Sequence, residues 1–159
     1  MIQIITKIIV KGKSPQQIFD WLSNLNQERY VQWHPNAHKD FKWIRKTKDF
    51  VGSIIYFDEV FDGVRVNCKW EVIEVKNNFP ISAGCKMKAK TFYPVYAYIS
   101  GKKIDSNTEI THIIGIGFSF KGLEKIFDWL IKKFILTERK RKAVDRHATE
   151  EFKNLEKII

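Results

Sequence analysis

A carboxylate lies among apolar residues in the segment 53–62. Because side chains alternate along a strand, one face of this segment carries Ile55, Phe57, Glu59 and Phe61. An unpaired carboxylate on such a face would cost several kcal/mol or would take up a proton. Glu59 therefore requires a cation, a set of hydrogen-bond donors or a metal ion beside it.

An imidazole and a second carboxylate share a helical face near the end of the chain. Val144, Ala148 and Leu155 define an apolar arc at helical spacing, with Glu151 inside this arc and His147 at its edge. The spacing H-x-x-x-E places the two polar side chains one above the other. Since both are zinc ligands, they could chelate one metal ion. The alternative is a His–Glu hydrogen bond on the helix surface.

Three further histidines add to this chemistry. His34 and His38 lie at the junction between a short predicted helix and a strand, where segments held by a rigid scaffold often carry functional groups. His112 alternates with Ile110 and Ile114 on an apolar strand face. It is either a hydrogen-bonded core residue or part of a pocket.

Together these groups form a candidate metal-ligand set. It comprises one imidazole from residues 34–38, Glu59, His147 and Glu151. Two nitrogens and two carboxylates from three separate elements suit zinc, and manganese or iron is also chemically compatible.

The elements that would position this set follow from hydrophobic periodicity. Strands are predicted at residues 2–11, 39–47, 53–62, 64–76, 83–91, 95–104 and 109–120, and short helices at 15–23 and about 26–33. From Leu123 onward the apolar spacing becomes helical, through Phe127, Leu130 and Phe134, which predicts one long C-terminal helix, bent near 137–142. Ser14-Pro15 predicts the start of the first helix, Pro35 the end of the second, and Asp62-Gly63 a hairpin turn.

This order predicts a single α+β domain over residues 1–159. A curved antiparallel sheet of about six or seven strands would wrap on the long C-terminal helix, with two short helices after the first strand. We expect an apolar pocket between the sheet and the helix.

Composition and charge narrow the class of protein. With 159 residues, 44% hydrophobic and 29% charged, the chain is expected to form one globular domain. No apolar window is long enough to span a bilayer, and the first residues predict a strand and not a signal peptide. Cys68 and Cys85 fall on apolar strand faces, so we expect buried free thiols and a cytoplasmic location.

The net charge of +10 raises the question of an anionic partner. We consider nucleic acid unfavoured as a partner, since no recognition helix, zinc finger or interleaved aromatic–basic motif is present. The densest basic run, 139–142, is expected to be a solvated helix surface, with a docking patch as the alternative.

The order of elements resembles the START-like helix-grip superfamily, also called SRPBCC. More narrowly, the stretch Arg29-Tyr30, Trp33-His34-Pro35, Ala37-His38 resembles the RY–W–P–AH stretch of the diacetylphloroglucinol and phloretin hydrolases, which are metal-dependent carbon–carbon hydrolases. Gly52 followed by residues 54–59 is similar to the segment that supplies their metal-binding glutamate, and the terminal H-x-x-x-E matches their last ligand pair.

The resemblance implies a zinc site formed by His38, Glu59, His147 and Glu151. It also implies a hydrolase that acts on an apolar acylphenol or polyketide-like molecule inside the cavity. The alternative is a non-catalytic carrier or binding protein for an apolar ligand.

Candidate roles follow for the residues around this site. His34 and Tyr30 are candidate acids or bases, and the candidate pocket residues are Tyr56, Phe57, Trp70 and His112.

Overall fold

Residues 2–92, 94–117, 129, 131 and 137–159 are described by the structure, a computed structural model of the chain. In this part of the chain the strands are β1 (Ile2–Val10), β2 (His38–Arg45), β3 (Ile54–Phe61), β4 (Val64–Asn78), β5 (Ser82–Ala89), β6 (Val95–Ile104) and β7 (Asn107–Ile116). The helices are α1 (Pro15–Ser23), α2 (Gln27–Trp33) and α4 (Glu138–Ile158).

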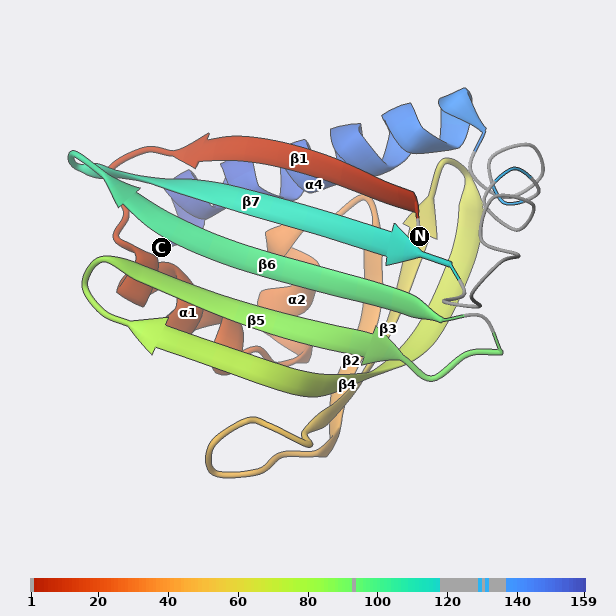
Figure 1. Cartoon of the computed structure of the whole chain (residues 1–159), viewed down its shortest axis with the longest axis horizontal. Coiled ribbons are helices and arrows are strands. Elements are labelled where there is room, and N and C mark those ends of the chain that lie inside the picture. The colour runs from red at the N-terminus through yellow and green to blue at the C-terminus, as the bar shows by residue number, and fades with distance from the viewer. Residues whose placement is uncertain (1, 93, 118–128, 130, 132–136) are drawn as a thin grey trace.

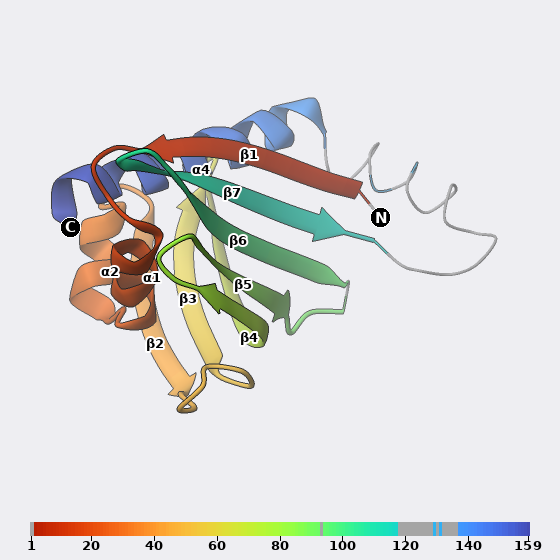
Figure 2. The same cartoon turned by 60° about the vertical axis from the view of Figure 1, so that its left-hand side comes forward.

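The strands form one antiparallel sheet, which confirms the predicted α+β fold. Among the described residues the sheet has seven strands in the order β1-β7-β6-β5-β4-β3-β2. The sheet is curved, and α4 runs along its concave side next to β1 (Figure 1). Figure 2 shows α1 and α2 together at one end of the curved sheet, close to the C-terminal end of α4. The helices therefore cover the concave side of the sheet and one of its ends.

Local sequence signals account for most of the element boundaries. The hydroxyl of Ser14 accepts a hydrogen bond from the backbone N–H of Gln17, whose side chain accepts one in return from the Ser14 N–H. This capping box starts α1 where it was predicted. The second helix ends at Trp33, before Pro35, and Asp62 with Gly63 forms the turn between β3 and β4.

The predicted C-terminal helix is confirmed over α4, but it is not continuous through residue 137, where Thr137 has an extended backbone in place of the predicted bend. It begins at Glu138, after the N-cap Thr137, whose side chain accepts a hydrogen bond from the N–H of Lys140. The predicted helical positions Leu123, Phe127, Leu130 and Phe134, and the end of the predicted strand 109–120, lie outside the described residues. No helix in the described ranges combines the length and hydropathy needed to cross a membrane.

The basic run on α4 is exposed, as the favoured reading of a solvated helix surface requires. All four residues of 139–142 are exposed, and two of them pair with acidic neighbours, Arg139 with Asp62 and Lys142 with Glu138.

The two cysteines are free thiols, as predicted, but they are partly and not fully buried. Burial raises the pKa of the Cys85 thiol to about 11, so it remains a thiol at neutral pH.

The first strand gives a direct test of the sheet's two faces. Its residues alternate between buried and exposed along the whole strand, with Ile8 3% exposed and Ile5 55% exposed. We expect Ile8→Ala to lower the free energy of unfolding by about 2–5 kcal/mol, because it leaves a cavity in the core. The matched variant Ile5→Ala should change it by less than about 0.5 kcal/mol. Denaturant titration measures both, and equal costs would contradict the assigned faces.

Candidate metal centre at the wall of an apolar cavity

The pairing of β2 with β3 places an imidazole beside a carboxylate. His38, the first residue of β2, is the direct cross-strand partner of Glu59 in β3. A register shift between His38 and Asp40 interrupts the pairing, whereas Phe41 pairs regularly with Phe57. Strict alternation would place His38 on the opposite face from Phe41, three residues away. The irregularity turns it inward, as β-bulges near functional sites often do.

The other two members of the predicted set come from α4. His147 and Glu151 lie one turn apart and face the sheet interior. The indole N–H of Trp33 donates a hydrogen bond to the Glu151 carbonyl oxygen at 2.8 Å, and the Asn154 side chain donates to the Trp33 carbonyl at 3.0 Å. These two bonds fix α4 against α2 at the level of the site.

The structure brings all four predicted ligands together. The Nε2 atom of His38 lies 3.3 Å from a Glu151 oxygen and 3.8 Å from a Glu59 oxygen. The Nε2 atom of His147 lies 3.5 Å from a Glu59 oxygen and 3.9 Å from a Glu151 oxygen. Ligands about 2.0–2.1 Å from a tetrahedral zinc ion lie roughly 3.3–3.4 Å apart. The four imidazole–carboxylate distances, 3.3–3.9 Å, therefore lie at or slightly above this spacing.

The hydrogen bonding of His38 orients its free nitrogen toward the carboxylates. Its Nδ1 lies 2.8 Å from the backbone carbonyl oxygen of Tyr30. A carbonyl oxygen only accepts, so Nδ1 carries a proton and Nε2 is the nitrogen available to a metal. This Nε2 atom is buried and has no hydrogen-bond partner among the described residues. A backbone carbonyl behind a metal-facing imidazole is the usual arrangement in metal sites.

Tyr30 contacts both of these ligands. Its ring stacks on the His38 ring with centroids 3.9 Å apart and 3° between the planes. Its hydroxyl donates a hydrogen bond to a Glu59 oxygen at 3.4 Å. Burial, followed by the charges of Glu59 and Glu151, raises the pKa of Tyr30 well above its usual range. The hydroxyl therefore keeps its proton and acts as a hydrogen-bond donor to Glu59.

The charges of the site stabilise one another. Burial opposes ionisation of Glu151, but His38 and His147 outweigh it and hold the pKa of this carboxyl below its ordinary value. Burial also lowers the pKa of His147, whereas Glu59 and Glu151 raise it, and the net direction is upward. In the absence of metal, the two carboxylates therefore favour the protonated form of His147.

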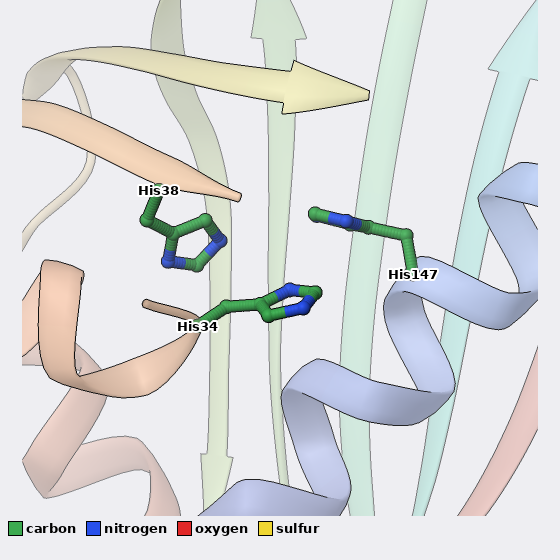
Figure 3. Close-up of side chains that lie close together, drawn as sticks. All are labelled: His34, His38 and His147. Atoms are coloured by element: carbon green, nitrogen blue, oxygen red, sulfur yellow. The ribbon is translucent and has the colours of Figure 1, made fainter. Parts of the chain in front are cut away.

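A third imidazole lies beside this set. The potential ligand atoms of His34, His38 and His147 all lie within 4.8 Å of one another, and their rings face one common space (Figure 3). Burial, followed by the neighbouring imidazoles, lowers the pKa of His34. Its Nε2 lies 3.3 Å from an oxygen of Glu150, a residue that sequence reasoning did not single out.

The metal-ligand set opens onto an internal cavity of about 450 Å³. The lining residues that carry aromatic rings include Phe41, Trp43, Phe57, Trp70 and Phe152. Glu59, His147 and Glu151 belong to the same lining. The cavity is thus apolar over most of its surface and ionic at one wall.

All but one of the predicted pocket residues line the cavity. Phe57, Trp70 and His112 line the cavity, and burial lowers the pKa of His112. Tyr56 does not line it, because it alternates with Phe57 along β3 and so lies on the outer face, where the Lys42 ammonium is 4.9 Å from its ring centroid. Tyr30 lines the cavity. His34 does not line it, and its ring lies beside the ring of His147.

Comparisons with known proteins rest on structure alone. No protein-family model and no curated protein matches the sequence. A START superfamily protein from Mycobacterium smegmatis superposes with a TM-score of 0.69 and 13% identity, over 99% of this chain and 96% of its own. The chain has the START-like helix-grip fold.

Two plant proteins share this helix-grip fold. Ginseng major latex-like protein 151 from Panax ginseng superposes with a TM-score of 0.68 and 10% identity, over 98% of this chain and 95% of its own. A norcoclaurine synthase point mutant from Thalictrum flavumn, in complex with a transition state analogue, gives a TM-score of 0.60 and 16% identity, over 99% and 96% of the two chains. At these identities the likeness establishes the fold and no activity. The narrower resemblance to carbon–carbon hydrolases stays a prediction.

The charge arrangement of the metal-free protein predicts the order of its histidine pKa values. His147 should titrate above the ordinary value of 6.5 in an NMR titration, and His112 and His34 below it. Protonation of His147 then stabilises the fold below about pH 6.5, and this contribution is lost as the pH rises through its raised pKa. Glu151→Gln should lower the His147 pKa, whereas Glu109→Gln, on β7 beside Lys7, should leave it unchanged. A His147 pKa below that of His112 would contradict the arrangement.

Proposed function

We propose that this chain binds an apolar, aromatic small molecule in its cavity, next to a divalent metal ion. The observation that carries the proposal is the ionic wall of the 450 Å³ cavity, whose other lining residues are mostly apolar. A volume of this size falls in the usual range of small-molecule pockets, roughly 300–1,000 Å³. Aromatic walls favour a ligand with a flat apolar ring.

The proposed metal ligands are His38, Glu59, His147 and Glu151, and zinc is the favoured ion. Their spacing, the unpartnered Nε2 of His38 and the carbonyl behind its Nδ1 support this assignment. Other divalent transition metals also accept imidazole and carboxylate ligands. When bound, such an ion polarises a carbonyl oxygen and lowers the pKa of a bound water toward neutrality.

Ligand binding without catalysis explains most features of the cavity. Its aromatic residues exclude water and pack against an apolar ring, while the protonated hydroxyl of Tyr30 holds Glu59 in place. A carbonyl or phenol oxygen of the ligand would lie toward the ionic wall. A carrier of acylphenol-like molecules needs nothing more than these features.

Hydrolysis is the second candidate function, and the position of His112 favours it. This residue lines the cavity, and its Nδ1 is buried without a hydrogen-bond partner in the described part of the chain. The charge of Glu151 also acts on the pKa of His112. Water would add to the acyl carbon and the bond from that carbon to the ring would break. The products would be a carboxylic acid and a ring carbon that has gained a proton. In this proposal His112 would pass that proton to the ring carbon.

Metal content tests the ionic wall. Protein purified without a histidine tag should carry about one zinc ion per chain, or take it up on addition of zinc, as measured by elemental analysis. The double variant His147→Ala, Glu151→Ala should lose the metal and keep its circular dichroism spectrum. A matched control is Glu138→Ala, Lys142→Ala, which removes an exposed pair with the same spacing from the same helix. Wild-type protein that takes up no divalent metal would remove the metal centre from the proposal.

Filling the cavity tests ligand binding. Ala97 lines the cavity in β6 and is 4% exposed, so Ala97→Phe should occupy part of the ligand's space. We expect at least a tenfold loss of affinity for an acylphenol, followed by quenching of tryptophan fluorescence. The control Ile104→Phe changes a 38% exposed residue of the same strand and should bind like the wild type.

The same samples separate the two functions. Chromatography after incubation should return the acylphenol intact if the chain is a carrier, and a carboxylic acid with the deacylated phenol if it is a hydrolase. Equal affinity of both variants and the wild type, or no binding at all, would contradict the proposed cavity function.

A further inference from the structure

The ring of His34 lies against the metal-ligand set without belonging to the four donors assigned above. Its centroid is 4.8 Å from that of His147 and 5.5 Å from that of His38. The His34 side chain is largely buried, with 10% of its surface exposed. Figure 3 shows the rings of His34, His38 and His147 converging on one space from three segments of the chain.

The two nitrogens of His34 have different surroundings. Its Nε2 lies 3.3 Å from a carboxylate oxygen of Glu150, so the proton of the neutral ring belongs on this nitrogen. Its Nδ1 is then left with a free lone pair. This atom is buried and has no hydrogen-bond partner among the residues that the structure describes. An unpartnered buried nitrogen destabilises the fold, and a ligand at that atom would remove this cost.

We propose that His34 is a third imidazole ligand of the metal ion, bound through Nδ1, and that Glu150 orients it. The inference rests on the proposed metal site and adds a fifth donor to it. A carboxylate behind the distal nitrogen of a metal-bound imidazole is a common outer-shell arrangement. Here Glu150 would hold His34 as the Tyr30 carbonyl holds His38.

The required movement is small. The three imidazole donors lie within 4.8 Å of one another, and donors on one ion with bonds of about 2.1 Å lie roughly 3.0–4.2 Å apart, depending on the angle between them. Closure by less than about 2 Å therefore brings His34 into the set. Three imidazoles with two carboxylates form a five-donor site, and imidazole-rich sites suit zinc, copper, iron and nickel.

X-ray absorption spectroscopy of the zinc-loaded protein counts the imidazole ligands directly. We expect three imidazoles in the wild type and two in His34→Ala, with zinc affinity at least tenfold lower in the variant. Glu150→Gln should retain three imidazoles and bind zinc about 10–100-fold more weakly, because the ring loses its orienting carboxylate. Glu138→Gln makes the same change at an exposed position of the same helix and should bind zinc like the wild type.

The possible results separate this inference from the proposed function. Two imidazoles in the wild type, with unchanged zinc affinity in His34→Ala and Glu150→Gln, would overturn the role of His34 and leave the four-donor site standing. A wild type that binds no zinc would overturn both. If His34→Ala fails to fold, the imidazole count of the wild type and the affinity of Glu150→Gln still decide the question.

Discussion

The charge of two carboxylates inside an apolar cavity is the constraint on which the arrangement of the site depends. Glu59 and Glu151 are largely buried, with 20% and 13% of their side chains exposed. Carboxylates in such surroundings must be neutralised or paired. His38 and His147 lie within 4 Å of both. The contacts that hold these imidazoles therefore also determine where the cavity can be polar.

Separate parts of the chain converge to meet this constraint. The irregular start of β2 turns His38 inward, β3 supplies Glu59, and α4 supplies the pair one turn apart. Trp33 connects α2 to α4 through its indole hydrogen bond to the Glu151 backbone and its ring contact with Phe152. The helix-grip fold leaves a hollow between sheet and helix, and this chain places its buried charges at one wall of that hollow.

Much of this could be predicted from the sequence, because period-two and helical spacing are direct consequences of backbone geometry. Glu59 stood out as a charge on an apolar strand face, and His147 with Glu151 as a pair on a helical arc. His38 could not be oriented by periodicity, since a register shift decides its face. Glu150 gave no signal, because an exposed glutamate on a helix is ordinary until the fold brings His34 to it. Tyr56 was assigned to the pocket against the alternation that placed Phe57 there.

We propose that one divalent ion lies between β2, β3 and α4. Anomalous diffraction at the zinc absorption edge, from crystals of zinc-loaded protein, tests it most directly. We expect a single strong peak about 2.0–2.1 Å from the Nε2 atoms of His38 and His147, and within about 2.2 Å of oxygens of Glu59 and Glu151. Zinc bound only at surface residues, with these four side chains arranged as in the metal-free protein, would contradict it.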